Sequence, residues 1–402
     1  MLTVDQAFAE ILRTVTPSSP VGMPLDLARG RVLAEEVISS VDSPPFDKSL
    51  MDGYAVTCDA AQRELVVVGE ITAGQVAQGV VQSGTAVRIM TGAPLPQGTE
   101  SIVRVEDTES LGHDRVRIHV QEINRGGNLI RRGAALQDGE TVISTGQRLG
   151  PSQLGALAEL GHHPVRVYPQ PRVAVLATGD ELVPYDQTPG PGQIRNSNEL
   201  MLSAQVRQAG AEAVPLGIAR DDRAELRERI ASGLQCDILC LSGGVSAGIL
   251  DLVPAVLQEL GVREIFHKVR VKPGKPIWFG YRPCVNGTSP CYVFGLPGNP
   301  VSSLVCFELF VRTAIRRMQG LTDCLPRAES RQLTKSVSHH DPRPTYHPSR
   351  CDSDNGVELV SWQGSSDLRA TALADSMTLL PTGPLELAIG SRVMVYRWAG
   401  DS

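Results

Sequence analysis

Short runs of apolar residues, separated by glycine, dominate the chain from about residue 63 to 145. The runs ELVVVGEITAG, TAVRIMTGAPLPQG, SIVRVEDT and RVRIHVQEI begin at residues 64, 85, 101 and 115. Runs of this length that are rich in Val and Ile and bounded by turn-forming residues are typical of strands. We therefore predict a small β-rich domain here. Residues 320 to 402 show a weaker pattern of the same kind and end in LELAIGSRVMVYRW.

Between these two regions the pattern changes to strands that alternate with helices. The predicted strands are RVAVLA, AVPLGIA, CDILCL, EIFHKVRV, PIWFGY and CYVFGL, the first of them at residues 172 to 177. Buried strands that alternate with amphipathic helices are typical of a doubly wound α/β sheet. This fold class is therefore expected for the middle of the chain.

Helix starts can be recognised from capping residues. The N-terminal stretch TVDQAFAEILRTV has apolar residues at helical spacing and is predicted to be a packing helix. The other helices are expected to begin near polar residues that follow a strand, and one of them to run from 251 to 260. The predicted starts are Thr3 with Gln6, Asn196 with Glu199, Asp222 with Glu225, Asp251, and Asn299 with Pro300.

In a doubly wound sheet, ligands bind outside the carboxyl ends of the strands. The segments expected there are Thr178-Gly179-Asp180-Glu181, Arg220-Asp221-Asp222, Ser242-Gly243-Gly244-Val245-Ser246 and Gly295-Leu296-Pro297-Gly298-Asn299-Pro300. Glycine turns and helix N-termini can hold an anion through backbone amides. Each loop alone is also explained by a tight strand-to-helix turn. Neither of the two glycine-rich loops, SGGVS and GLPGNP, has the fingerprint of a dinucleotide site or a P-loop.

Three lysines lie together in HKVRVKPGKP. Lys268 and Lys272 are four residues apart, so on a strand they share a face, and Pro273-Gly274 is predicted to hold Lys272 and Lys275 in a turn. Lysines on an edge strand also serve simply as solvated protection against aggregation. Carboxylates on the same rim would repel a phosphate unless a divalent cation lay between them. Acids, lysines and glycine loops together therefore imply Mg²⁺ and a phosphorylated ligand.

Composition narrows the class of protein further. The chain has 402 residues, 42% of them hydrophobic, and a net charge of -6, which fits two to four compact domains and argues against nucleic-acid binding. No apolar run approaches the roughly 20 residues of a membrane helix. The eight cysteines form no CxxC pair, and no signal peptide is visible, so a reducing cytoplasm is expected. A covalent serine mechanism is not supported, because there is no GxSxG motif.

Six motifs, in order, resemble one known family. They are PPFDKSLMDGYAV, RIMTGAPLPQG, ATGDEL, SGGVSAG followed by Asp251, KPGKP and GLPGNPVSS, and they span about residues 40 to 305. The sequence resembles the molybdopterin molybdenumtransferases, which include the gephyrin E domain. The resemblance implies four subdomains: a connecting one (20–40 and 140–168), a β-rich one (41–139), a molybdopterin-binding α/β one (1–19 and 169–321) and a C-terminal β-barrel-like one (322–402).

The resemblance also implies a reaction. Adenylylated molybdopterin binds with Mg²⁺, molybdate enters, and AMP and molybdenum cofactor leave. It implies a homodimer in which Asp52 and Thr91 in and near the loop at 43 to 53 complete the site of the partner subunit, and a molybdopterin adenylyltransferase as the upstream partner. The residues carried over as catalytic are Asp52, Thr91, Glu181, Asp222, Asp251, Lys268, Lys272 and Lys275.

Other site residues follow from the same motifs. The acids expected to hold Mg²⁺ are Asp221, Asp222, Glu181 and Asp251, and the choice between the adjacent Asp221 and Asp222 stays open. The residues expected to bind the substrate are Ser242, Gly243, Gly244, Ser246, Gly295, Pro297, Gly298, Asn299, Pro300 and Ser302.

The chain departs from the family pattern at a few positions, and two other functions remain possible. Ala134 and Ala135 stand where the family often has acids, and Leu252 stands where an aromatic residue is common. A non-catalytic, gephyrin-like scaffold is one alternative, although the intact acids and lysines argue against it. A divergent paralogue that handles tungstate is the other, because molybdate and tungstate are tetrahedral dianions of similar size.

Overall fold

The structure is a computed structural model that describes residues 1–76, 79–112, 114–244, 252–284 and 289–398. Contacts divide the chain into two compact units. One consists of Met1–Ala34, Gly146–Gly150 and Pro164–Ser402, and the other of Glu35–Thr145 and Pro151–His163. The division falls within the segments 20–40 and 140–168, which we expected to form a single connecting subdomain.

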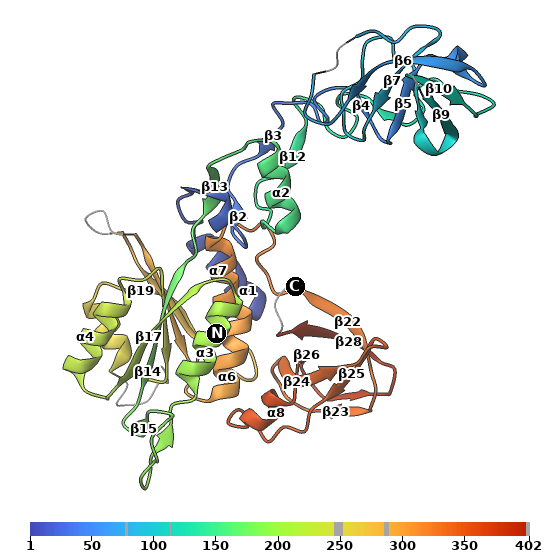
Figure 1. The fold of residues 1–402 in the computed structure, drawn as a ribbon. Helices are drawn as coiled ribbons and strands as arrows, with labels where there is room; N and C mark the ends of the chain where they lie inside the picture. The colour runs from blue at the N-terminus through green and yellow to red at the C-terminus, as the bar shows by residue number, and fades with distance from the viewer. Residues whose placement is uncertain (77–78, 113, 245–251, 285–288, 399–402) are drawn as a thin grey trace. The chain divides into compact units, whose positions relative to one another are not determined.

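A six-stranded sheet forms the centre of the first unit (Figure 1). In spatial order its strands are β17 (Glu212–Ala219), β14 (Arg172–Thr178), β18 (Ile238–Ser242), β21 (Cys291–Leu296), β20 (Trp278–Arg282) and β19 (Arg263–His267). The first four are parallel. β20 is antiparallel to both of its neighbours, β21 and β19, and β17 and β19 form the edges of the sheet. The predicted doubly wound α/β sheet is confirmed.

Alternate residues of the buried strands face two separate cores. Val173 and Val175 of β14 pack in a core with α1 (Val4–Thr14), α3 (Asn198–Gln208) and the long helix at residues 300–318. Ala174 and Leu176 pack in a second core with α4 (Arg223–Gly233) and α5 (Val253–Glu259). The long helix consists of α6 (Pro300–Cys306), a π-helical turn (Phe307–Val311) and α7 (Arg312–Met318). Helices therefore cover both faces of the sheet (Figure 1).

Most of the predicted helix starts are confirmed. Thr3 and Gln6 form the capping box of α1, and Asn299 with Pro300 opens α6. The carboxylate of Asp222 accepts hydrogen bonds from the first backbone amides of α4. The N-cap of α3 is Ser197, one residue after the predicted Asn196. The side-chain oxygen of Asn196 nevertheless accepts from the amide of Glu199 at 3.2 Å, as the predicted pair requires. The start expected at Asp251 lies outside the described residues, and α5 is described from Val253.

The predicted strand EIFHKVRV was wrong in its second half. β19 ends at His267, and Lys268 has a left-handed backbone with φ of 71°. The chain then folds back on itself, since the amide of Val269 donates to the carbonyl of Lys275 at 3.0 Å. Burial of Val269 and Val271 in the core holds this loop. Lys268 and Lys272 therefore do not share a strand face.

The C-terminal part of the first unit is a closed barrel, as predicted. Its strands are, in order, β22 (Ala328–Leu333), β25 (Gly356–Leu359), β24 (Thr345–Cys351), β26 (Ser376–Leu380) and β28 (Arg392–Arg397). The pair β23 (Val337–His339) and β27 (Leu385–Leu387) and the helix α8 (Leu368–Ala372) accompany it. The remaining strands of the first unit are β1 (Val21–Met23), β13 (Val165–Tyr168) and β2 (Val32–Leu33), which form one sheet, and the pair β15 (Leu182–Val183) and β16 (Ile194–Arg195).

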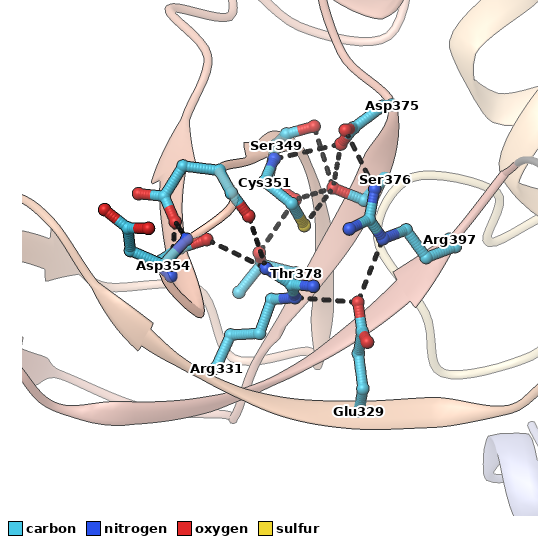
Figure 2. Close-up of polar contacts among 11 residues, drawn as sticks. Glu329, Arg331, Ser349, Cys351, Asp354, Asp375, Ser376, Thr378 and Arg397 are labelled. Carbon is cyan, nitrogen blue, oxygen red and sulfur yellow. Dashed lines mark hydrogen bonds and ion pairs between the residues drawn. The ribbon is translucent and has the colours of Figure 1, made fainter.

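A polar network lies in this barrel (Figure 2). The buried hydroxyls of Ser349, Ser376 and Thr378 hydrogen-bond to one another at 2.8 and 3.0 Å. Glu329 accepts hydrogen bonds from Arg331 and Arg397. Because these groups form hydrogen bonds with one another, we interpret the network as one that stabilises the barrel.

The second unit contains a six-stranded sheet with a core on each face. Its strands are, in order, β8 (Ser101–Arg104), β5 (Gly53–Val56), β7 (Thr85–Ile89), β6 (Glu64–Ile71), β10 (Arg115–Ile118) and β9 (Thr108–Gly112). Two short pairs, β4 (Lys48–Ser49) with β11 (Leu129–Ile130) and β3 (Val37–Ile38) with β12 (Thr141–Ile143), and the helix α2 (Pro151–Glu159) complete it. In neither unit does a described helix have the length and apolar character needed to cross a bilayer.

Candidate functional site

A cavity of about 740 Å³ lies at the carboxyl ends of the parallel strands in the first unit. All four segments that were expected at the carboxyl ends of the strands contribute to its lining. These lining residues are Thr178, Gly179 and Glu181 after β14, Asp221 after β17, Ser242, Gly243 and Gly244 at the end of β18, and Pro297, Gly298, Asn299 and Pro300 after β21. The sheet topology therefore collects acidic residues and glycine turns around one opening.

The glycine turn after β18 packs against the end of β14. Gly243 and Gly244 have positive φ, and a Cβ atom at Gly243 would lie 2.6 Å from the carbonyl oxygen of Thr178. At Gly244 it would lie 2.7 Å from the Thr178 hydroxyl. These glycines are thus required by packing, whatever the cavity binds. At Gly298 the nearest atom to a Cβ is at 3.8 Å, so that position leaves room.

Asn299 connects the cavity to the C-terminal part of the unit. It is the N-cap residue of α6, yet its side chain makes no capping hydrogen bond. Its amide donates instead to the hydroxyl of Ser365 at 2.7 Å, and its carbonyl accepts from Ser366 at 3.3 Å. Ser366 and Leu368 line the cavity, and neither was predicted. Ser365-Ser366 precedes Asp367, the N-cap of α8, and such a cap was the signal available in the sequence.

Asp221 and Asp222, left open as alternatives by the sequence, have different surroundings. The carboxylate of Asp222 accepts from the amides of Ala224 at 3.0 Å and Glu225 at 2.9 Å, and Asp222 does not line the cavity. Asp221 does line it. Partial desolvation of its carboxyl group, together with the negative charges of Asp180 and Glu181, raises the pKa of Asp221, although the residue as a whole is exposed. The geometry therefore favours Asp221 as the acid that faces a ligand.

A bound Mg²⁺ fits these acids only if the ligand supplies further oxygens. Among residues 1–76, 79–112, 114–244, 252–284 and 289–398, no three His, Cys, Asp or Glu side chains come together as a metal site. Mg²⁺ is often held by one or two carboxylates, with water and substrate phosphate completing its shell. Glu181 and Asp221 meet that requirement, and the raised pKa of Asp221 shows negative charge that a cation would balance. Asp251 and Ser246, both predicted here, lie outside the described residues.

The three predicted lysines lie in or beside the loop that follows β19, and none of the three is among the residues that line the cavity. Pro276, from the same loop, does line it. The ammonium group of Lys272 pairs with Asp341 at 2.9 Å and lies 6.0 Å from the centre of the Trp362 ring.

Two other predicted substrate-binding residues are buried away from the cavity lining. Gly295 lies within β21, paired with Leu241 and Trp278 of the neighbouring strands. Ser302 is buried in the first turn of α6. Their positions fit packing of strand and helix, and the cavity is lined by the residues between them.

Asp52 and Thr91 lie together in the second unit. The carboxylate of Asp52 accepts from the backbone amide of Thr91 at 2.6 Å and from its hydroxyl at 2.8 Å. These hydrogen bonds lower the pKa of Asp52. Thr91 therefore holds the carboxylate of Asp52 in a fixed position and in its ionised form, at the end of the loop at 43 to 53.

Ion pairs hold the start of that loop. Asp47 accepts from the amide of Arg132 at 2.8 Å and from the Arg131 guanidinium at 2.5 Å. Asp42 accepts from the Arg132 guanidinium at 2.5 Å. These contacts tie the start of the loop to the segment that contains Arg131 and Arg132.

Two residues that line the cavity each have a buried polar atom without a hydrogen-bond partner among the described residues. These atoms are the hydroxyl of Thr178 and the side-chain oxygen Oδ1 of Asn198. The amide nitrogen of Asn198 is fully used, since it donates to Ser242 Oγ at 2.7 Å and to the carbonyl of Gly298 at 2.8 Å. Sequence reasoning missed Asn198, although the polar run Asn196-Ser197-Asn198 before α3 was visible.

The fold and cavity define a class of α/β protein that matches known family models along most of the chain. Residues 2–161 match the MoeA N-terminal region (domain I and II), and residues 174–317 match a probable molybdopterin binding domain. The crystal structure of a molybdopterin biosynthesis MoeA protein from Pyrococcus horikosii superimposes with a TM-score of 0.84 at 28% identity, covering 100% of both chains.

Curated relatives narrow the class to one family. Molybdopterin molybdenumtransferase 2 of Mycobacterium tuberculosis H37Rv is 36% identical over 409 residues and covers 98% of each chain. Molybdopterin molybdenumtransferase of Haemophilus influenzae is 38% identical over 325 residues, which cover 80% of this chain and 78% of the relative. The chain belongs to the molybdopterin molybdenumtransferase family, and the resemblance in its motifs is confirmed.

Proposed function

We propose that this protein inserts molybdate into adenylylated molybdopterin in a reaction that needs Mg²⁺ and releases AMP. The observation that carries the proposal is the cavity at the strand ends, which combines Glu181 and Asp221 with glycine turns and the start of α6. The names of the relatives support the molybdopterin chemistry. The tetrahedral oxyanion, molybdate or tungstate, is the co-substrate.

Each part of the cavity has a role in this proposal. Glu181 and Asp221 would hold Mg²⁺, which when bound neutralises charge on the phosphate that is cleaved. The amide of Gly243 already donates to the carbonyl of Leu296 at 3.1 Å. The backbone amide of Gly244 and the start of α6 would orient the phosphate, because helix starts and glycine turns favour anions. Fixed donors of this kind stabilise charge that develops during the reaction.

The predicted lysines keep a proposed role beside the cavity. Lys268 and Lys275 would draw the anionic substrates toward the opening by their charge. Lys272 is held by Asp341, so in this proposal it acts from a fixed position and not as a flexible surface group.

We also propose that the working unit is a homodimer in which the partner subunit supplies Asp52 and Thr91. The support from the structure is the exposed apolar surface beside that pair. Phe46, Leu50 and Met51 are 43%, 46% and 44% exposed. Apolar groups gathered on one exposed loop are typical of an interface. A cytoplasmic location and an upstream molybdopterin adenylyltransferase belong to the same proposal.

A direct assay tests the reaction. The purified chain is incubated with adenylylated molybdopterin, Mg²⁺ and either molybdate or tungstate, and AMP and metal-loaded cofactor are followed by chromatography. Release of AMP coupled to loaded cofactor is the expected result, and the two oxyanions are ranked by rate. Tight binding of the pterin without AMP release would overturn the proposal in favour of a non-catalytic scaffold.

A further inference from the structure

We propose that Asn198 is a specificity-determining residue, whose side-chain oxygen accepts a hydrogen bond from an amino group on the heterocycle of the bound substrate. This inference rests on the proposed function, because adenylylated molybdopterin carries such amino groups. It concerns one part of the cavity, where a polar side chain is buried and incompletely paired.

The hydrogen bonds of Asn198 fix the direction of its amide group. The carbonyl of Gly298 can only accept, so the group 2.8 Å from it has to be the amide nitrogen Nδ2. Its second hydrogen goes to Ser242 Oγ at 2.7 Å. Both donors are therefore used, and exchanging Oδ1 with the nitrogen would place two acceptor oxygens against each other at Gly298.

Burial makes the unpaired oxygen informative. Asn198 is 9% exposed and Thr178 is 3% exposed, and each has one polar atom without a partner among the described residues. Buried polar atoms are nearly always hydrogen-bonded, so an exception calls for an explanation. Both residues line the same cavity and both contact the turn that begins at Ser242. A ligand that fills the cavity would supply the missing partners.

The chemistry of the free atom identifies which part of a ligand it can take. Oδ1 of Asn198 is an acceptor and would repel phosphate or molybdate oxygens, whereas it favours an N–H donor. The Thr178 hydroxyl can donate or accept, so the two atoms suit an aromatic ring that carries both an amino group and ring nitrogens. The anionic end of the substrate is then left to the glycine turns and the start of α6.

Two amino-bearing rings occur in adenylylated molybdopterin, namely the pterin and the adenine. Two pairs of stable probes separate them. Pterin-6-carboxylate is compared with lumazine-6-carboxylate, in which an oxo group replaces the 2-amino group. AMP is compared with inosine monophosphate, in which an oxo group replaces the 6-amino group.

The experiment measures the dissociation constants of all four probes for the full chain with Mg²⁺, in the wild type, in Asn198→Ala and in Ser203→Ala. Ser203 is the matched control, because its hydroxyl is also buried and without a partner among the described residues, and lies on α3 but does not line the cavity. We expect the wild type and Ser203→Ala to favour the amino member of one pair by roughly tenfold. Asn198→Ala should bind both members of that pair equally.

The pair that shows the preference identifies the ring that Asn198 contacts, and either pair supports the inference. Equal affinities within both pairs in the wild type would overturn it, and this result needs no variant to fold. A preference that persists in Asn198→Ala would overturn it as well. Turnover of adenylylated molybdopterin is measured separately on the wild type. Turnover without discrimination refutes the role of Asn198 alone, whereas discrimination without turnover refutes the proposed function alone.

Discussion

The ammonium nitrogen of Lys272 lies 2.9 Å from a carboxylate oxygen of Asp341, which precedes the barrel strand β24. The backbone is joined at the same place. The amide of Lys272 donates to the carbonyl of Pro344 at 2.9 Å, and the amide of Tyr346 donates to the carbonyl of Lys272 at 2.8 Å. A lysine that the sequence motif assigned to catalysis is thus held in position by the C-terminal domain, in which none of the six motifs lies.

Asp341→Asn should destabilise the protein in a pH-dependent way. Burial alone would raise the pKa of Asp341, but the hydrogen bonds from Lys272 and the amide of Arg343, with the charges of both residues, lower it overall. A lowered pKa in the folded state adds stability above the unfolded pKa of about 3.9, and this stability is lost as the pH falls through the folded pKa. We expect a loss of about 1.5 to 3 kcal/mol at pH 7.

Urea unfolding of wild type and Asp341→Asn at pH 7 and at acid pH checks this expectation. The exposed Asp186 provides the control, since Asp186→Asn should leave the unfolding midpoint unchanged at both pH values. An Asp341→Asn variant as stable as the wild type at pH 7 would show that the pair with Lys272 contributes nothing.

A buried ion pair in the long helix gives a larger predicted effect. The guanidinium of Arg312 donates to both carboxylate oxygens of Glu308, at 2.7 and 2.8 Å, and the side chains are 7% and 5% exposed. Arg312→Leu would leave the Glu308 charge buried, which should cost about 3 to 5 kcal/mol. Arg13→Leu removes an exposed pair with Glu10 on α1 and should cost less than about 1 kcal/mol. Similar thermal midpoints for the two variants would contradict the prediction.

Glycine substitutions separate backbone strain from packing. Gly243 and Gly261 both have positive φ, but a Cβ meets the Thr178 carbonyl at 2.6 Å in Gly243 and nothing within 4 Å in Gly261. Gly261→Ala should therefore cost about 1 to 2 kcal/mol from strain alone. Gly243→Ala adds a clash with backbone and should lower the thermal midpoint by clearly more. An equal shift for both variants would mean that the turn after β18 can move away from β14.

The doubly wound sheet and most of its helix caps could be predicted because they depend on local patterns. Alternation of apolar residues in RVAVLA places Val173 and Ala174 on opposite faces, and the structure puts them in different cores. The loop at Lys268 could not be predicted in this way. Its left-handed backbone and its return onto Ile277 depend on contacts that form only in the folded core.

The candidate site was predicted in part for the same reason. Strand order alone brings Glu181, Asp221 and Gly298 to one cavity. The family motif left the choice between Asp221 and Asp222 open, although the helix cap predicted at Asp222 was the signal that separates the two acids. The cap at Asp367 marks the turn that contains Ser366, but its contact with Asn299, 67 residues away in the chain, depends on the folded structure and could not be predicted.

The adjacent acids provide a test of the site with an internal control. Asp221→Asn should abolish AMP release, whereas Asp222→Asn should retain it, because Asn also caps helices well and the start of α4 is kept. The pKa of Asp221 is raised in the folded state, so its ionisation costs stability above the unfolded pKa of about 3.9. Asp221 is exposed, so Asp221→Asn should be more stable than the wild type at pH 7 by less than about 1 kcal/mol.

Steady-state AMP release and thermal midpoints at pH 7 measure both effects. Loss of activity in Asp222→Asn with normal stability would reverse the assignment of the two acids. Addition of Mg²⁺ should raise the midpoint of the wild type more than that of Asp221→Asn, because a ligand that binds the folded state more tightly stabilises it more.

Mixed dimers can decide whether Asp52 acts in the site of the partner subunit. Asp52→Ala and Glu181→Ala should each be inactive as pure proteins. When the two chains are co-expressed with different tags, half of the dimers are mixed, and each mixed dimer has one site with both residues intact if Asp52 crosses the interface. Activity should then return to about a quarter of the wild-type value, because mixed dimers make up half of the population and one of their two sites is complete. Mixed dimers that are purified on both tags and remain inactive would place Asp52 in the site of its own chain or outside the site altogether.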